Sequence, residues 1–392
     1  MRAPSYPQVP KQILPIIVFS QFAGTSLWFA GNAILPSLQK TLGTSASMLG
    51  HITSAVQTGF ILGSLLFGVL SLADRFSPRK LFFICSSLGA GTNLVLIFLP
   101  LTVTTLLLFR FLTGIFLAGI YPVGMKVAAD WHEKGLGKAL GYLVGALVLG
   151  TAFPHLLKAL TPTLPWTYLL IGTSGFAALG GWLLWLLVPD GPYRKRNQAT
   201  NFKAALHIFK NKSFRQAAIG YFGHMWELYT FWAFVPVMLA AYPHRLAYDV
   251  WPVSYYAFWV IAPGSLACVA GGYLSEKLGS KKIAIGALTL SGICGLVSPF
   301  ISELTFPLFL VFLLFWGLVV IADSPQFSAL VAQAVPKEFT GTGLTLVNCL
   351  GFFITIISLQ VLNGLKLFIS EQYLYLFLAI GPAIGLIALL RK

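Results

Sequence analysis

Long apolar runs separated by short polar turns follow one another along the whole chain. About 20 consecutive apolar residues are needed for one helix to cross a bilayer. Twelve such runs can be placed, over residues 13–36, 48–73, 80–100, 104–126, 138–158, 166–188, 216–240, 252–275, 281–300, 305–330, 341–363 and 372–390. The pattern predicts an all-α polytopic membrane protein with twelve transmembrane helices.

Composition agrees with this pattern. Of the 392 residues, 57% are hydrophobic and 9% are charged, whereas about 25% of residues are charged in soluble domains. A soluble globular protein is therefore excluded. The cysteines Cys85, Cys268, Cys294 and Cys349 all lie inside apolar runs, so we expect neither a disulfide framework nor a metal site, and no cofactor.

The only long hydrophilic stretch, residues 189–215, divides the chain into two halves. It separates six predicted spans in residues 1–188 from six in residues 216–392, and it is rich in lysine and arginine. We expect each half to form a six-helix bundle and the stretch to be a basic cytoplasmic linker. The polar start of the chain leads straight into the first span, so we expect that span to be retained as an anchor.

The net charge of +15 would by itself fit a nucleic-acid-binding protein. Lysine and arginine near spans, however, concentrate on the cytoplasmic side of a membrane. With both termini cytoplasmic, the basic residues on the opposite side are Lys40, Lys158, Arg245 and Lys366, and Arg110 lies within a span. The charge is therefore explained by topology in a lipid bilayer, and we expect no nucleic-acid partner.

The two halves carry related loops. Residues 72–80 align with residues 274–282, and Gly114 and Pro122 match Gly317 and Pro325 at nearly the same spacing. Two six-span halves with parallel repeats, which meet at a central site, are one plan of secondary transporters. The repeat therefore favours alternating access.

The second loop, residues 272–282, is similar to the signature loop of the major facilitator superfamily, with a glycine, an acidic and basic pair, a turn glycine and a closing basic pair. The first copy keeps its acid and its basic residues. Over nearly its whole length the chain resembles this family, whose shorter-loop bacterial members lie in the cytoplasmic (inner) membrane. The resemblance implies a conformational latch made by Asp74, Arg75, Arg79, Glu276 and Lys281. The alternative is that these residues only fix topology and a tight turn.

Ionisable residues inside the spans are the first candidates for function. Arg110, Glu227 and Asp323 each lie in an apolar run, where a charge costs about 2.5–3.5 kcal/mol, so we expect them to face the interior. His224 and Glu227 are three residues apart and share one helical face, where together they can carry a proton. We interpret all four as proton-coupling or substrate-binding residues; structural ion pairs are the alternative.

Two further features concern the same residues. Arg110 begins a sequence, Arg-Phe-Leu-Thr-Gly, that resembles a family motif associated with proton coupling or substrate handling. Asp323 stands beside Pro325, which interrupts helical hydrogen bonding and permits a bend. We expect Asp323 to act as a gate or a proton site, or to reach the inner water.

Polar and aromatic residues within spans one, two, seven and eight are candidates for lining a cavity. These are Gln21, Asn32, Gln57, Trp226, Tyr229 and Tyr256. Interhelical hydrogen bonds and simple packing are the alternatives.

Taken together, these features predict a secondary active transporter of a small solute, coupled to protons and monomeric, rather than an enzyme. A transporter-fold sensor, a membrane-embedded enzyme and a metal-ion carrier using His224 and Glu227 remain alternatives. Two acids against one arginine favour a cationic or zwitterionic solute slightly, and the sequence does not give the solute or the direction of transport.

Overall fold

The computed structural model describes residues 9–45, 47–132, 136–194, 208–243, 251–336 and 339–391. Within these ranges every regular element is a helix. Predicted topology charges at Arg2, Lys134, Lys195, Arg196, Lys203, Arg245, Lys337 and Lys392 lie outside the described residues.

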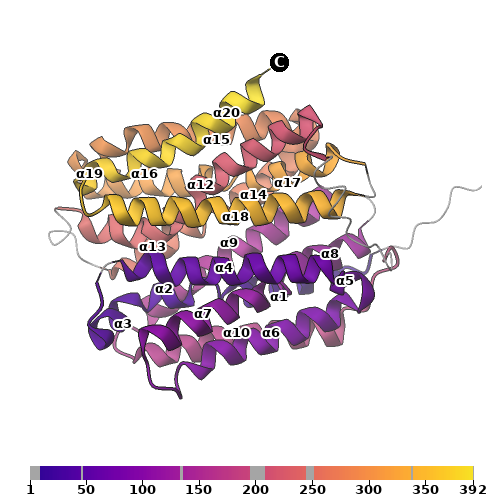
Figure 1. The fold of residues 1–392 in the computed structure, drawn as a ribbon, viewed down its shortest axis with the longest axis horizontal. Coiled ribbons are helices and arrows are strands. Elements are labelled where there is room, and N and C mark those ends of the chain that lie inside the picture. The colour runs from indigo at the N-terminus through magenta and orange to yellow at the C-terminus, as the bar shows by residue number, and fades with distance from the viewer. Residues whose placement is uncertain are drawn as a thin grey trace, which may run out of the picture.

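The amino-terminal half contributes one bundle of long helices. Its elements are α1 (Ile13–Thr25), α2 (Ala30–Ala33), α3 (Leu35–Leu42), α4 (Met48–Val69), α5 (Leu72–Arg75), α6 (Pro78–Val95), α7 (Val103–Leu117), α8 (Tyr121–Trp131), α9 (Leu136–Leu160) and α10 (Trp166–Leu187). Most of this bundle occupies the lower, purple part of Figure 1.

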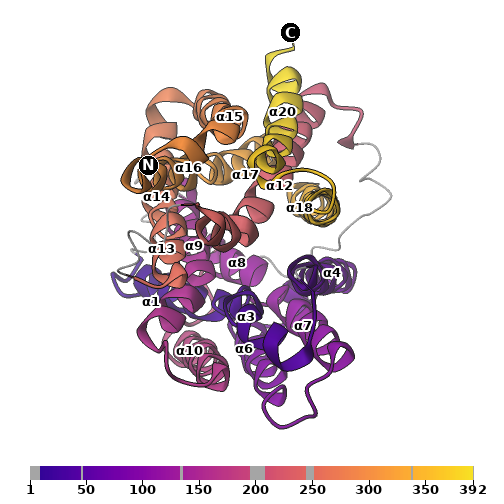
Figure 2. The ribbon, with the colours of Figure 1, turned by 90° about the vertical axis from the view of Figure 1, so that its left-hand side faces the viewer.

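The carboxy-terminal half forms the second bundle, in the upper part of Figure 1. Its elements are α12 (Lys212–Ala241), α13 (Val253–Ile261), α14 (Gly264–Leu278), α15 (Ser280–Val297), η2 (Ser298–Glu303), α16 (Phe306–Val319), α17 (Ser324–Gln333), α18 (Thr340–Leu365), α19 (Glu371–Leu374), η4 (Tyr375–Ala379) and α20 (Ile380–Leu390). Seen from the end, the two bundles lie one above the other (Figure 2).

The predicted fold class is confirmed. In the described part of the chain, nine helical segments are long and apolar enough to cross a membrane, and Ile13–Thr25 is a shorter apolar helix. The helices Pro78–Val95 and Lys212–Ala241 run alongside these segments (Figure 1). The second of them begins inside the stretch predicted as linker.

Several spans are broken into two helices, where the hydropathy pattern predicts one. Pro122, Pro263 and Pro325 stand at the start of α8, α14 and α17. Proline supplies no N–H to the preceding turn, so a helix is interrupted most cheaply there. Span one, in contrast, breaks between Thr25 and Ala30 without a proline, and the cause lies in span four, as described below.

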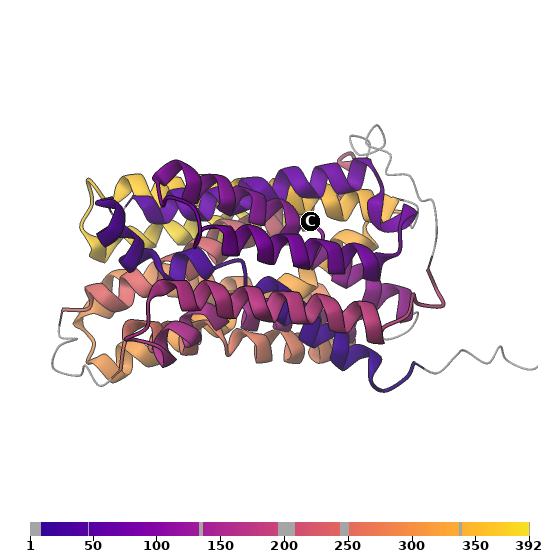
Figure 3. The ribbon, with the colours of Figure 1, turned by 90° about the horizontal axis from the view of Figure 1, so that it is seen from below.

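The helices run roughly parallel to one another, so that the molecule has two ends (Figure 3). We call the end at which α10 stops and α12 starts the linker end. The loops after α4 and α14 also lie there, and the carbonyl of Arg391 accepts a hydrogen bond from Gln216 near the start of α12. The halves meet where α9 packs against α13 and α14, and where α4 packs against α18.

Candidate functional site

Arg110 of α7 is fully buried and bonds to main-chain oxygens of span one. Its Nη2 donates to the carbonyls of Leu27 and Trp28 at 2.8 and 2.7 Å, and its Nη1 donates to Oδ1 of Asn93 at 3.0 Å. These carbonyls follow the end of α1, where helical partners are missing. The guanidinium therefore stabilises the break in span one.

Asn93 of α6 completes this arrangement. Its Nδ2 donates to Oγ of Ser174 at 3.0 Å and to Oγ1 of Thr173 at 3.2 Å, both on α10. Within the described residues Arg110 makes no ion pair with a carboxylate. The alternative stated from the sequence, that Arg110 forms a structural ion pair, therefore has no acidic partner among these residues. A buried charge without a counter-ion is costly, so this guanidinium is a focus of positive potential beside the break.

Glu227 of α12 is buried and accepts a hydrogen bond from an indole. Nε1 of Trp316 on α16 donates to Oε1 of Glu227 at 2.7 Å. Ser291 of α15 also interacts with this carboxyl group. Glu227 is thus held between three helices of its own half.

His224 faces Asp323 across the start of α17. Its Nδ1 lies 2.8 Å from Oδ1 of Asp323, and both side chains are 1% exposed. Nε2 of His224 and Oδ2 of Asp323 have no hydrogen-bond partner in the described part of the chain. The sequence predicts that His224 works with Glu227; in the structure its direct neighbour is Asp323.

An aromatic cluster joins the two halves at the centre. The ring of Trp28 lies 4.9 Å from that of Phe60 in its own half, and 5.5 and 5.4 Å from those of Tyr229 and Phe352 in the other half. Trp232 packs edge-on against Tyr229 at 5.2 Å. Tyr229, a predicted cavity residue, therefore lies where the halves meet, next to the break in span one.

Several buried polar atoms in spans one, two and seven have no hydrogen-bond partner among the described residues. They include both amide atoms of Gln57, Oδ1 of Asn32 and the indole nitrogens of Trp28 and Trp232. Nδ2 of Asn32 donates to Thr53 at 2.7 Å. A buried polar group without a hydrogen-bond partner costs free energy.

Other predicted cavity residues lie away from the cluster. Gln21 donates to the carbonyl of Tyr121 at 3.3 Å, between α1 and α8. Trp226 donates to the carbonyl of Phe377 at 2.9 Å, between α12 and η4. Tyr256 packs edge-on against Phe306 at 5.3 Å. Their contacts join neighbouring helices, which agrees with the alternative of interhelical hydrogen bonds and packing.

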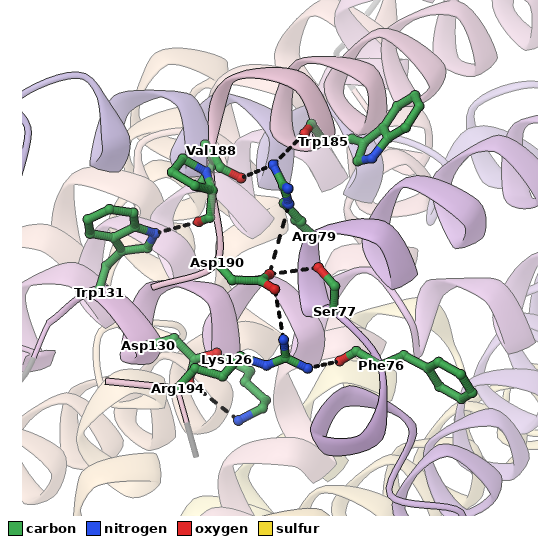
Figure 4. Close-up of polar contacts among 11 residues, drawn as sticks. Phe76, Ser77, Arg79, Lys126, Asp130, Trp131, Trp185, Val188, Asp190 and Arg194 are labelled. Carbon is green, nitrogen blue, oxygen red and sulfur yellow. Dashed lines mark hydrogen bonds and ion pairs between the residues drawn. The ribbon is translucent and has the colours of Figure 1, made fainter. Parts of the chain in front are cut away.

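The predicted latch residues of the amino-terminal half bind to their own half. Arg79 donates to the carbonyl of Trp185 at 3.2 Å and lies 4.0 Å from Asp190, which also pairs with Arg194 at 2.7 Å and accepts from Ser77 at 2.7 Å (Figure 4). Asp190 therefore ties the start of the linker to the loop after span two.

Asp74 has a separate partner. Nζ of Lys126 on α8 lies 3.0 Å from Asp74 and 3.4 Å from Asp130. Arg75 is exposed, and it makes no ion pair with another described residue. Among the described residues, neither Asp74 nor Arg75 makes an ion pair with the other half.

Glu276, in contrast, forms a contact between the halves. Nζ of Lys138 on α9 lies 3.1 Å from Oε2 of Glu276 on α14 and 4.9 Å from the ring centre of Tyr273. The hydroxyls of Tyr142 and Tyr273 are 3.2 Å apart. Lys281 has no ion-pair partner among the described residues and instead lines a pocket at the linker end.

A metal site is not formed by the described residues, which contain no group of three or more His, Cys, Asp or Glu side chains suited to a metal ion. The four cysteines are free and buried. The metal-carrier alternative therefore has no preformed ligand set in this part of the chain.

Several residues that the sequence analysis passed over are central to the site. Asn93 and Trp316 hold Arg110 and Glu227, yet each reads as one polar or aromatic residue in an apolar run. In the sequence, Lys138 is interpreted only as a topology charge, and Asp190 only as part of the linker. The sequence gives no signal for the pairs Lys138–Glu276 and Arg79–Asp190, because the two residues of each pair are more than 100 residues apart.

Similar proteins agree with this architecture. A probable sulfoacetate transporter, SauU, of Cupriavidus necator is 22% identical over 292 residues, which cover 69% of this chain and 66% of that protein. A probable L-galactonate transporter of Escherichia coli is 24% identical over 340 residues, which cover 76% and 72% of the two chains.

The fold is also that of a solved structure. The human organic anion transporter MFSD10 (TETRAN) superposes with a TM-score of 0.77 at 15% identity, over 97% of this chain and all of that one. The sequence profile of the Major Facilitator Superfamily matches residues 17–359. The resemblance predicted from the two signature loops is thereby confirmed: the chain belongs to the Major Facilitator Superfamily, a family of transporters rather than enzymes.

Proposed function

We propose that this protein is a proton-coupled secondary transporter of a small organic anion, working by alternating access in the cytoplasmic membrane with its linker end in the cytoplasm. One observation carries the choice of solute charge. Arg110 is buried beside the break in span one with no carboxylate partner among the described residues, whereas Asp323 faces His224.

The pairing of charges changes the preference that the sequence gives. Counting two acids against one arginine favours a cation. In the structure Glu227 already accepts an indole N–H, and Asp323 already has a basic neighbour. Among the described residues, the guanidinium of Arg110 is a basic intramembrane group without a carboxylate partner, and an anion near Trp28 would supply its counter-charge.

The contacts between the halves support alternating access. At the linker end the halves are joined by Lys138 and Glu276. At the other end Nε2 of Gln360 on α18 donates to Ser54 on α4 at 2.8 Å. A solute at the central aromatic cluster is then enclosed from both sides, and release requires one of these two sets of contacts to open.

Proton coupling is assigned to the carboxy-terminal half. Nδ1 of His224 lies 2.8 Å from Oδ1 of Asp323 in a buried site, so the imidazole and the carboxyl group are within reach of one shared proton. Glu227 lies one turn further along the same helix. In this proposal Arg110 of the amino-terminal half binds the charge of the solute. His224, Asp323 and Glu227 of the carboxy-terminal half carry the proton.

The names of the relatives point in the same direction. One is described as a sulfoacetate transporter and another as an L-galactonate transporter, and both of these solutes are organic anions.

The test is uptake into proteoliposomes with an inward proton gradient. We expect uptake of sulfoacetate or L-galactonate, or of another small carboxylate or sulfonate in a panel, and no uptake of choline as the cationic control. The variant Glu227→Gln should fold and lose pH-driven uptake. Uptake of choline alone would contradict the anion assignment, and undiminished pH-driven flux in Glu227→Gln would remove this residue from coupling.

A further inference from the structure

A pocket at the linker end lies inside the carboxy-terminal half, away from the boundary between the halves. Its volume is about 230 Å³. It is lined by Ser213, Gln216, Ala217, Lys281, Leu330, Gln333, Ala334 and Leu389, from α12, α15, α17 and α20. Its polar lining residues Ser213, Lys281 and Gln333 are exposed, whereas Ala217 and Leu389 are buried.

The pocket lies on the same helical faces as the His224 and Asp323 pair. On α17, Asp323 is followed at helical spacing by Phe327, Leu330 and Ala334, and the last two line the pocket. On α12, seven residues separate His224 from Ala217, another lining residue. At 1.5 Å per residue the pocket is about 10 Å from the pair along each helix.

Along α17, Phe327 lies between Asp323 and the pocket residues Leu330 and Ala334. Its ring centre lies 5.9 Å from that of His224, and the side chain is fully buried. It fits because position 220 is glycine: a Cβ atom there would lie 2.5 Å from the Phe327 ring and 3.3 Å from Leu389 of the pocket wall. One aromatic ring thus bridges the pocket wall and the buried histidine.

We propose that this pocket is the route by which the His224 and Asp323 pair exchanges protons with water at the linker end, with Phe327 as the gate. The route runs within one half and is separate from the solute's path between the halves. It rests on the proposed function, since it gives that proton site its access.

Polar atoms of the pair are free to bond to water. Nε2 of His224 and Oδ2 of Asp323 have no hydrogen-bond partner in the described chain, so each has a free position for water or a proton. Other titratable side chains lie close to the pair: the ring of Tyr221 on α12 is 5.9 Å from that of His224, and Sγ of Cys268 on α14 is 3.7 Å from the carbonyl oxygen of Ile321. Glu227 lies one turn along α12 from His224. Of the residues that line the pocket, Lys281 is charged, and it is exposed.

The test uses the reaction of buried histidines with diethyl pyrocarbonate, followed at each histidine by mass spectrometry in the intact protein. This reagent adds to an unprotonated imidazole nitrogen and needs no transported solute. His51 is exposed and serves as the fast reference. His155 is the matched control, since it is buried in the other half and its Nε2 also lacks a partner.

We expect His224 to react slowly in the unmodified protein and at least about tenfold faster in Phe327→Ala, with a smaller gain in Phe327→Leu and no change at His155. The more conservative variant keeps the test available if Phe327→Ala does not fold. In unmodified protein, reaction of His224 as fast as that of His51 would overturn the gate.

Blocking the pocket tests the route itself. In the Phe327→Ala background, Gln333→Cys labelled with a trimethylammonium thiol reagent should return the His224 rate to its original value. The same label at Lys277→Cys, exposed at the linker end but outside the pocket lining, should leave the rate high. Fast reaction despite a filled pocket would overturn the route.

The proposed function fails by a different result. The reaction rates of His224 can change as expected while uptake of the panel solutes does not respond to a proton gradient. That result would support the access route and contradict proton coupling.

Discussion

Lys138 and Glu276 join the two halves at the linker end, with Nζ and Oε2 3.1 Å apart. The acid belongs to the second signature loop, while the corresponding acid of the first loop, Asp74, is paired with Lys126 inside its own half. The two related loops therefore make different contacts in this conformation. The second loop contacts the amino-terminal half through Glu276, whereas Asp74 of the first loop contacts a helix of its own bundle.

Charge removal at this contact should open the linker end. The side chains are 38% and 50% exposed, so the pair contributes roughly 0.2–1 kcal/mol. We expect Glu276→Gln to increase the population open at the linker end by about 1.4- to fivefold. Spin labels at Arg75→Cys and Lys277→Cys, on opposite halves, would report the change as a larger share of long distances.

The control for this prediction is the charge swap. Lys138→Glu combined with Glu276→Lys should restore the original distance distribution, because the pair is rebuilt with opposite polarity. An unchanged distribution in Glu276→Gln would mean that other contacts, such as that between Tyr142 and Tyr273, hold the linker end closed.

Asn93→Asp is a sharp test of the solute's charge. Oδ1 of Asn93 lies 3.0 Å from Arg110, and aspartate has nearly the same shape, so the substitution places a counter-ion on the guanidinium. We expect the protein to fold and to lose at least about tenfold in uptake of the organic anion, because Arg110 is then neutralised. Uptake of sulfoacetate and L-galactonate into proteoliposomes is the measurement.

A matched variant separates charge from lost hydrogen bonds. Asn93→Leu also removes the bonds from Nδ2 to Thr173 and Ser174 but leaves Arg110 without a counter-ion. It should lower thermal stability more than Asn93→Asp does, since a buried donor is left unpaired. Equal anion uptake in Asn93→Asp and the unmodified protein would contradict the proposed role of the charge.

Much of the fold follows from the sequence because hydropathy acts over each span separately. The helices follow the apolar runs closely, and the interruption near Pro325 appears between Val319 and Ser324. The break in span one is not visible in residues 13–36, since it depends on a guanidinium from span four that reaches the carbonyls of Leu27 and Trp28. A local pattern cannot report a bond made across 80 residues of chain.

The sequence predicts which ionisable residues are buried in the spans, but it does not predict which of them contact one another. An ionisable group in an apolar run is easy to find, and Arg110, Glu227 and Asp323 are all buried. Helical spacing suggests a partnership of His224 with Glu227, but packing of α12 against α17 brings Asp323 to the histidine instead. Which groups meet is a tertiary property, so it requires the structure.

Trp316→Phe tests whether the indole that binds Glu227 takes part in coupling. The substitution keeps an aromatic ring and removes the N–H that lies 2.7 Å from Oε1. The free energy of unfolding should fall by about 1–3 kcal/mol, because a buried acceptor loses its donor. We also expect pH-driven uptake to fall relative to solute exchange, which involves no net proton movement.

Trp226→Phe is the control for that variant. It removes an indole N–H that donates to the carbonyl of Phe377 and not to Glu227. It should lower stability by a similar amount and leave the ratio of pH-driven uptake to exchange unchanged. The same ratio in both variants would show that Trp316 acts in packing alone.

Asp190→Asn should release the start of the linker. The carboxylate binds Ser77, Arg194 and Arg79 together (Figure 4), and the amide keeps at most one acceptor oxygen and no charge. Because charge-assisted hydrogen bonds are roughly twice as strong as neutral ones, we expect trypsin to cleave after Arg194 several-fold faster. Asp74→Asn, which breaks the separate pair with Lys126, should leave this cleavage rate unchanged. An equal increase in both variants would mean that the cleavage rate reports a general loss of stability at the linker end. It would then not report the ion pair between Asp190 and Arg194.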